Sequence, residues 1–264
     1  MSRYLSITKI VILESLQYRV HFISTFFGNM LYLGIVYYVW KAIFEFNHKE
    51  VINGMTFGKT FLYVALAHAI LSLMGTLIDG EIARHILTGE ISNILTQPLK
   101  YIYRMFYHNL GLGITNFIII FVPTLIIIFV ISNNSCNLVT ILYFLLSIFL
   151  GHIINFLIDY ITGVTVFFTG NIWGIRGVKD GLMTLLSGLL IPIPYFPDTF
   201  SKVIKMLPFQ AVYNVPIEIL VKNGSSLSHA LTGIGIQVIW VVLLAVIAHL
   251  EYKSLYKRLS VNGG

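Results

Sequence analysis

The chain alternates long apolar runs with shorter polar segments. A helix needs about 20 mostly apolar residues to cross a hydrocarbon layer about 30 Å thick, and runs of about that length recur along the sequence. The fourth run is longer than the layer requires, the fifth is short, and Pro123 predicts a kink in the third. We therefore predict six membrane-spanning helices, at about residues 21–44, 57–78, 110–131, 138–168, 181–193 and 229–250.

Three further segments have a different pattern. Residues 1–19 alternate polar and apolar positions, which predicts a helix at the membrane interface or, alternatively, an extension of the first span. Residues 79–109 form the longest segment that mixes charged and apolar side chains. Residues 195–228 are too broken by prolines to span the membrane and too apolar for a plain loop, so we expect re-entrant or interfacial helices. The predicted fold class is an all-α polytopic membrane protein, with one transmembrane domain over residues 1–264.

The composition agrees with this fold. Hydrophobic residues make up 57% of the chain and charged residues 11%, whereas about a quarter of a soluble domain is charged. The lone Cys136 excludes a disulfide within one chain and a metal site built from cysteines. Nearly twice as many of the 17 Lys and Arg residues fall on the side of residues 79–109 as on the other side. Because Lys and Arg favour the cytoplasmic side, we expect both termini in the cytoplasm, and we attribute the net charge of +6 to this asymmetry rather than to nucleic acid binding.

Residues 54–60 are similar to a phosphate-binding loop but do not form one. A P-loop needs a glycine five positions before its Gly-Lys pair, which is Gly58-Lys59 here, and Asn53 occupies that position. No Ser-His-Asp set, HExxH motif or carboxylate pair occurs at a usable spacing. We therefore expect no catalytic residue, no ATPase site and no cofactor or metal bound by this chain.

Several polar side chains fall within the predicted spans. His152, Asn155 and Asp159 share one face of the fourth span. Ionisable groups inside a membrane are costly and often functional, so this face predicts either hydrogen bonds between helices or a proton relay. Two ionisable ligands do not make a metal site. The other polar candidates can pair with these residues or line a path, and they are Asn29, His68 and Asn116.

The order of these elements resembles the permease subunits of ABC-2-type (type V) ABC transporters, including six-span bacterial permeases. After the second span, those permeases have a Gly, a short helix, a Leu and a Pro, which correspond to Gly89, Leu95 and Pro98. Near the end of the fifth span they have a Ser-Gly and then prolines, which correspond to Ser187-Gly188, Pro192, Phe196-Pro197 and Leu207-Pro208-Phe209. The resemblance covers essentially the whole chain.

The resemblance implies a transport subunit without an ATPase site of its own. Two permeases, identical or different, would form a dimer in the cell membrane. Two separate ABC ATPase subunits would bind ATP and Mg²⁺ and attach to the cytoplasmic face. A coupling helix after the second span would offer an apolar ridge with a charged rim to a groove on the ATPase, through Gly89, Glu90, Ile91, Ile94, Leu95 and Pro98. The alternative is a solvated loop without a partner, which would leave the apolar residues of this set exposed.

The resemblance also implies export and an outer gate, at Pro192, Pro197, Pro208 and Phe209. A pathway walled by Phe, Tyr, Ile and Leu suits amphipathic cargo such as a drug, a peptide or a lipid. Two other functions stay open: a proton-coupled secondary carrier that uses Asp159 and His152, and a structural membrane protein that transports nothing. A carrier would work after ATP depletion and fail in Asp159→Asn, and a structural protein would respond to no transport assay.

Overall fold

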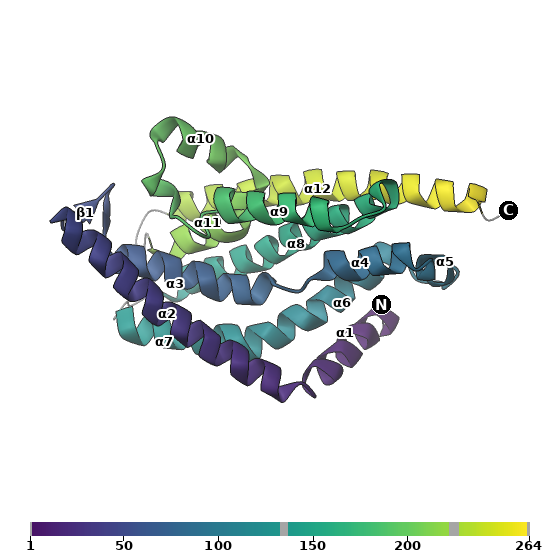
Figure 1. The fold of residues 1–264 in the computed structure, drawn as a ribbon, viewed down its shortest axis with the longest axis horizontal. Coiled ribbons are helices and arrows are strands. Elements are labelled where there is room, and N and C mark those ends of the chain that lie inside the picture. Colours follow the sequence, from purple (N-terminus) through teal and green to yellow (C-terminus); the bar gives the residue numbers. More distant parts are fainter. Residues whose placement is uncertain (1, 133–136, 222–226, 263–264) are drawn as a thin grey trace.

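The computed structural model describes residues 2–132, 137–221 and 227–262, and nearly all of them are helical (Figure 1). A hairpin of two short strands, β1 Val51–Ile52 and β2 Met55–Thr56, precedes the third helix. The helices are α1 Ser2–Ser15, α2 Arg19–Asn47, α3 Phe57–Met74, α4 Ile78–Leu87, α5 Glu90–Leu95, α6 Tyr101–Asn116, α7 Val122–Ser132, α8 Leu138–Thr169, α9 Trp173–Leu186, α10 Asp198–Met206, α11 Pro208–Val221 and α12 Leu227–Asn262.

The long helices lie roughly along one axis. Among the described residues, five helical segments are long and apolar enough to cross a membrane: Arg19–Asn47, Phe57–Leu87, Tyr101–Val130, Leu138–Thr169 and Ser228–Tyr256. The start of α1 and the end of α12 lie with α5 at one end of this bundle, and the β1–β2 hairpin and α10 lie at the other (Figure 1). The predicted all-α polytopic membrane fold is confirmed, and the number of six spans stays a prediction.

The second predicted span is interrupted. α3 ends at Met74, and α4 starts after Leu77, whose φ of 52° lies in the left-handed region. The carbonyl of Met74 accepts hydrogen bonds from the backbone N–H of Thr76 at 2.8 Å and from Nδ2 of Asn155 at 3.3 Å. These bonds replace the helical partner that the break removes, as irregular backbone inside a membrane protein requires.

A π-helical turn at Phe117–Phe121 joins α6 to α7. Pro123 follows it closely. A proline has no N–H, and in a regular helix its ring collides with the carbonyl four residues earlier. A wider turn gives the chain room at this point. The irregularity therefore falls where the sequence predicts a kink.

The fifth predicted span differs most from the structure. The sequence predicts a polar turn over residues 171–180 and a span over residues 181–193, but α9 already begins at Trp173 and ends at Leu186. Arg176 and Lys179 lie within this helix because they pair with carboxylates on α4 and α8 and need no water. With 14 residues, α9 alone is about 21 Å long, too short for a hydrocarbon layer of about 30 Å.

The described part of the predicted outer segment folds back into the bundle. α10 and α11 meet at Leu207, and Pro208 and Phe209 line a cavity with residues of α8 and α9. α11 is largely buried, and the Gln237 side chain of α12 donates to the carbonyl of Ala211 at 2.8 Å. This segment is therefore helical and packed against the long helices.

α1 packs along α6. Thr8 Oγ1 donates to the carbonyl of Tyr107 at 2.9 Å. Val11 lies against Gly111, where a side chain would collide with it. A glycine at such a contact lets two helices approach closely. The position of α1 at a membrane interface stays a prediction.

The segment similar to a phosphate-binding loop builds a turn and a helix cap. Asn53 and Gly54 have φ values of 47° and 79° and turn the β1–β2 hairpin. Thr56 Oγ1 then accepts a hydrogen bond from the backbone N–H of Lys59 at 3.4 Å and caps α3.

Candidate functional site

α5 is a short helix between α4 and α6 at one end of the bundle (Figure 1). After α4 ends at Leu87, Gly89 has a φ of 73°, the left-handed conformation that glycine adopts most easily. Nothing would obstruct a side chain at this position, so backbone conformation alone favours glycine. Pro98 is exposed and lies in the turn between α5 and α6. The structure thus places a separate helical element between Gly89 and Pro98.

The apolar side of α5 faces the protein itself. Ile91 and Ile94 are only 1% and 4% exposed and belong to the same buried cluster as Tyr101 and Met105 of α6. The predicted external ridge is therefore wrong for these two residues, and Leu95 is half-buried. The short helix is held between α4 and α6, so packing onto them removes its apolar surface from water without any partner.

The outward face of α5 is polar. Arg84 of α4 pairs with Glu90 at 2.7 Å, and Arg104 of α6 donates to the side chain of Gln97. These contacts hold both ends of α5 in one orientation, so a partner would meet a preformed surface. The exposed residues of this polar face are Glu90, Ser92, Asn93, Thr96 and Gln97.

A buried charge cluster, made of Asp79, Arg176, Lys179 and Asp159, joins the other end of α4 to α8 and α9. Asp79 is 0% exposed. Arg176 donates from Nε to Asp79 Oδ2 at 2.9 Å and from Nη2 to Oδ1 at 2.7 Å. Paired contacts of this kind are among the strongest side-chain hydrogen bonds.

Lys179 is shared between two carboxylates of this cluster. Its Nζ lies 3.0 Å from Asp79 Oδ2 and 2.7 Å from Asp159 Oδ1. Asn155 Nδ2 donates to the other oxygen of Asp159 at 3.0 Å, and the more exposed Asp180 lies 3.1 Å from the same amine. The two carboxylates and two cations of the cluster sum to zero charge, and such pairing is how membrane proteins accommodate ionised groups.

Glycines bring the three helices close enough for the charge cluster to form. A side chain at Gly80 would overlap the Arg176 guanidinium, and a Cβ at Gly163 of α8 would lie 2.8 Å from the Cβ of Ile82. Small residues commonly permit such close packing between membrane helices. α4 is therefore fixed to α8 and α9, although a break separates it from α3.

The polar residues predicted on the fourth span separate into two groups. Asp159 and Asn155 turn toward α9 and belong with the charge cluster. His152 turns toward α6, where its Nε2 lies 3.4 Å from Asn109 Nδ2. Asp159 and His152 therefore have different neighbours. Both form hydrogen bonds to other helices, which is one of the two predictions made for this face of the fourth span.

The remaining in-membrane candidates lie elsewhere. Asn29 of α2 bonds to two residues of α3, His68 at 3.1 Å and Ser72 at 3.0 Å. Asn116 lines a cavity of about 450 Å³ with Thr76, in the break between α3 and α4, and with residues of α1, α2 and α6. Among the described residues, no group of three or more His, Cys, Asp or Glu side chains could hold a metal ion.

The predicted outer-gate residues begin helical segments. Pro192 precedes a 3₁₀ turn, Pro197 precedes α10 and Pro208 opens α11. Proline suits such positions because its φ is fixed and the first N–H of a helix has no helical partner. Phe209 is half-buried against the core. A gating role for these four residues stays a prediction.

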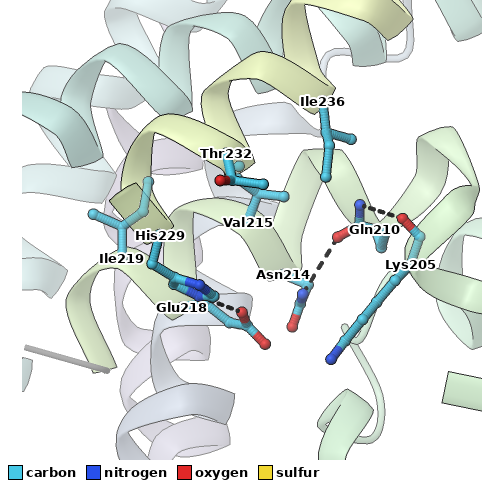
Figure 2. A pocket seen from close by; sticks show the side chains of 10 residues that line it. Lys205, Gln210, Asn214, Val215, Glu218, Ile219, His229, Thr232 and Ile236 are labelled. Atoms are coloured by element: carbon cyan, nitrogen blue, oxygen red, sulfur yellow. Dashed lines mark hydrogen bonds and ion pairs between the residues drawn. The ribbon is translucent and has the colours of Figure 1, made fainter. Parts of the chain in front are cut away.

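A pocket of about 130 Å³, lined by both polar and apolar side chains, lies where α10, α11 and α12 meet (Figure 2). Gln210, Asn214 and Glu218 line it from one face of α11, at every fourth position. Asn214 donates to Gln210 at 3.3 Å, and Glu218 Oε2 lies 3.2 Å from Nε2 of His229 on α12. Lys205 borders the opposite side of the pocket (Figure 2). The Glu218–His229 contact links α11 to α12.

The charge cluster was not predicted from the sequence. Arg176 and Lys179 indicated a polar turn over residues 171–180, and Asp79 lay just after the second predicted span. A signal was present, since Asp79 and Asp159 border or interrupt apolar runs and need buried partners. Arg176 and Lys179 are three positions apart, so a helix would place both cations on one face.

Nearly the whole chain, residues 11–263, matches the sequence model of the ABC-2 family of transporter proteins. The chain belongs to this family. ABC-2 permeases are the membrane components of ABC transporters, lack an ATPase domain of their own and associate with an ABC ATPase. The protein is thus a multi-pass membrane permease of the ABC-2 type. A comparison with curated proteins gave no match.

Proposed function

We propose that this ABC-2 permease is the membrane subunit of an exporter for an amphipathic substrate, such as a drug, a peptide or a lipid. The family match carries the assignment. The structure supports it with α5, a separate helix at one end of the bundle that has a fixed orientation and an exposed polar face. Export and the class of cargo follow from the resemblance and from the aromatic and aliphatic side chains of the helices.

The proposed assembly contains two permeases and two ATPase subunits. α2 and α12 leave most of their apolar surface uncovered within one chain, so they face lipid or the second permease, which is identical or different. ATP and Mg²⁺ bind to the ATPase subunits and not to this chain. α5 and both termini lie in the cytoplasm, in keeping with the excess of Lys and Arg there.

Six crossings of the cell membrane complete the proposed topology. α9 and residues 187–197 together make the fifth crossing, because α9 alone is too short. α10 and α11 make a re-entrant hairpin from the outer side, supported by the contact of Pro208 with the cavity between α8 and α9. Pro192, Pro197, Pro208 and Phe209 lie along this part of the chain and form the outer gate.

The ATPase contacts the polar face of α5. Ser92, Asn93 and Thr96 supply its exposed centre, and Glu90 supplies the charged rim. The buried apolar residues of α5 do not contact the ATPase, as the predicted ridge would. Instead they attach α5 to α4 and α6. Force applied to α5 then reaches the long helices instead of bending a loose loop.

Purification of the tagged permease from its native membrane, with a search for a bound ABC ATPase, tests the proposal. Native mass spectrometry is expected to show two permeases with two ATPase subunits. Asn93→Arg places a long cation in the centre of the contact and is expected to abolish the complex. Asn47→Arg makes the same change at an exposed site at the opposite end of the bundle and is expected to leave the complex intact. A wild-type permease that binds no ABC ATPase would contradict the proposal.

A further inference from the structure

α4 is separated from α3 by a break in the helix and is tied to α8 and α9 by side-chain ion pairs. Between α3 and α4 the helix is interrupted, and Leu77 has a left-handed backbone. In the first turn of α4, by contrast, Asp79 accepts two hydrogen bonds from Arg176 and one from Lys179. α4 therefore continues no straight helix from α3, and its firmest side-chain contacts are those of the charge cluster.

The other end of α4 holds α5. The Arg84–Glu90 pair joins the two helices at 2.7 Å, and the apolar side of α5 is buried in the core. α4 has ten residues and is therefore about 15 Å long. One short rigid element thus connects the surface where we place the ATPase to the charge cluster.

We infer that Arg176 and Lys179 are positioning residues of the transport cycle, which pass the movement of α4 to α8 and α9. The inference rests on the proposed function, because it takes α5 as the ATPase contact. Arg176 holds α9 to α4, and Lys179 holds α8 to both by bonding Asp159 as well as Asp79. Because Lys179 bonds one carboxylate on α4 and another on α8, α4 can shift relative to α8 while the amine keeps one of the two.

Distance changes at the outer end of the molecule test this inference without knowledge of the cargo. Cys136 is the single cysteine, so a Cys136→Ser chain accepts spin labels at cysteines placed at Phe46 of α2 and Phe200 of α10, both exposed. In the wild-type complex with its ATPase in nanodiscs, trapping with ATP and vanadate is expected to shift the distance between the labels. In Lys179→Gln, the complex is expected to form and to hydrolyse ATP, while the fraction of molecules that shift falls about tenfold.

Matched variants separate positioning from stability. Gly80→Ala displaces Arg176 without removing a charge and is expected to reproduce the loss, whereas Gly174→Ala adds the same methyl group to open space on α9 and is expected to have no effect. Lys179→Arg retains a cation and is expected to restore the shift. Lys59→Gln removes an exposed lysine and is expected to behave as wild type.

A full shift in both Lys179→Gln and Gly80→Ala would overturn the inference and leave the exporter assignment intact. A wild-type chain that neither binds the ATPase nor shifts would overturn the assignment, and the inference with it. If Lys179→Gln fails to fold, Gly80→Ala decides the question.

Discussion

At the scale of single residues, Asp79 is the side chain whose loss should cost the most stability. Asp79→Ala leaves Arg176 without its carboxylate in the charge cluster and Lys179 with Asp159 alone in the interior. Removing one partner of a buried ion pair costs about 3–5 kcal/mol. We expect the variant to melt at a clearly lower temperature than wild type in detergent, as followed by tryptophan fluorescence. An unchanged melting temperature would contradict the buried pairing.

An exposed ion pair supplies the control for Asp79→Ala. Glu45 lies 3.8 Å from Lys41 on α2, and both side chains are largely solvent-exposed. Such pairs contribute at most about 1 kcal/mol. Glu45→Ala should therefore have the same melting temperature as wild type. A decrease in melting temperature as large as that of Asp79→Ala would show that burial of the ion pair is not the cause.

Leu77 is a second residue whose effect on stability can be predicted, because its backbone conformation is unfavourable. A left-handed backbone is unfavourable by about 1–2 kcal/mol for a residue that has a Cβ, and the Leu77 side chain is mostly exposed, so it contributes little packing. Leu77→Gly should leave the free energy of unfolding unchanged or raise it by about 1 kcal/mol, and Leu77→Val should lower it. Chemical denaturation of both variants measures this difference. The opposite order would show that position 77 carries no backbone strain.

At the scale of elements, α5 shows which part of a helix can be predicted from its own sequence. Gly89 and Pro98 mark the ends of the element, because each restricts the backbone in a known way. Its apolar residues do not reveal which surface covers them. Ile91 and Ile94 suit an external groove as well as the flanking helices, and the answer depends on how α4 and α6 converge.

Two lysine substitutions on α5 distinguish the buried face from the exposed face. Ile91→Lys places a charge in the core and should destabilise the protein by several kcal/mol, on the order of 3. Asn93→Lys places the same charge on the exposed face and should leave the melting temperature unchanged while weakening ATPase binding. Thermal unfolding and native mass spectrometry on both variants measure the two effects. Equal melting temperatures would contradict the burial of Ile91.

α9 is an element whose local sequence led to a wrong prediction. Charged residues in an apolar chain ordinarily indicate a solvated turn, and Arg176 and Lys179 led to that prediction for residues 171–180. Their partners come from α4 and α8, which lie 97 and 20 positions away in the sequence. Such pairs form only if each helix turns the right face toward its neighbours and if the helices approach closely at Gly80 and Gly163. Neither condition can be predicted from the sequence around Arg176 and Lys179.

At the scale of the whole molecule, the apolar runs were enough to predict an all-α membrane protein, because few structures other than bundled helices satisfy the backbone inside a bilayer. The order of elements was enough to indicate the ABC-2 family, and the family match agrees. The connections between elements needed the structure. It shows a chain of contacts from α5 through α4 to the charge cluster, and from there to α8 and α9.

ATP-driven accumulation of amphipathic dyes in inverted membrane vesicles that contain the permease and its ATPase tests whether this protein belongs to an exporter. We expect at least one dye of a chemically varied panel to accumulate on addition of ATP. We further expect that vanadate stops the accumulation, that a protonophore does not, and that vesicles lacking the ATPase accumulate none. Accumulation that follows a proton gradient in the absence of ATP and is lost in Asp159→Asn would contradict ATP-driven export and indicate a proton-coupled carrier.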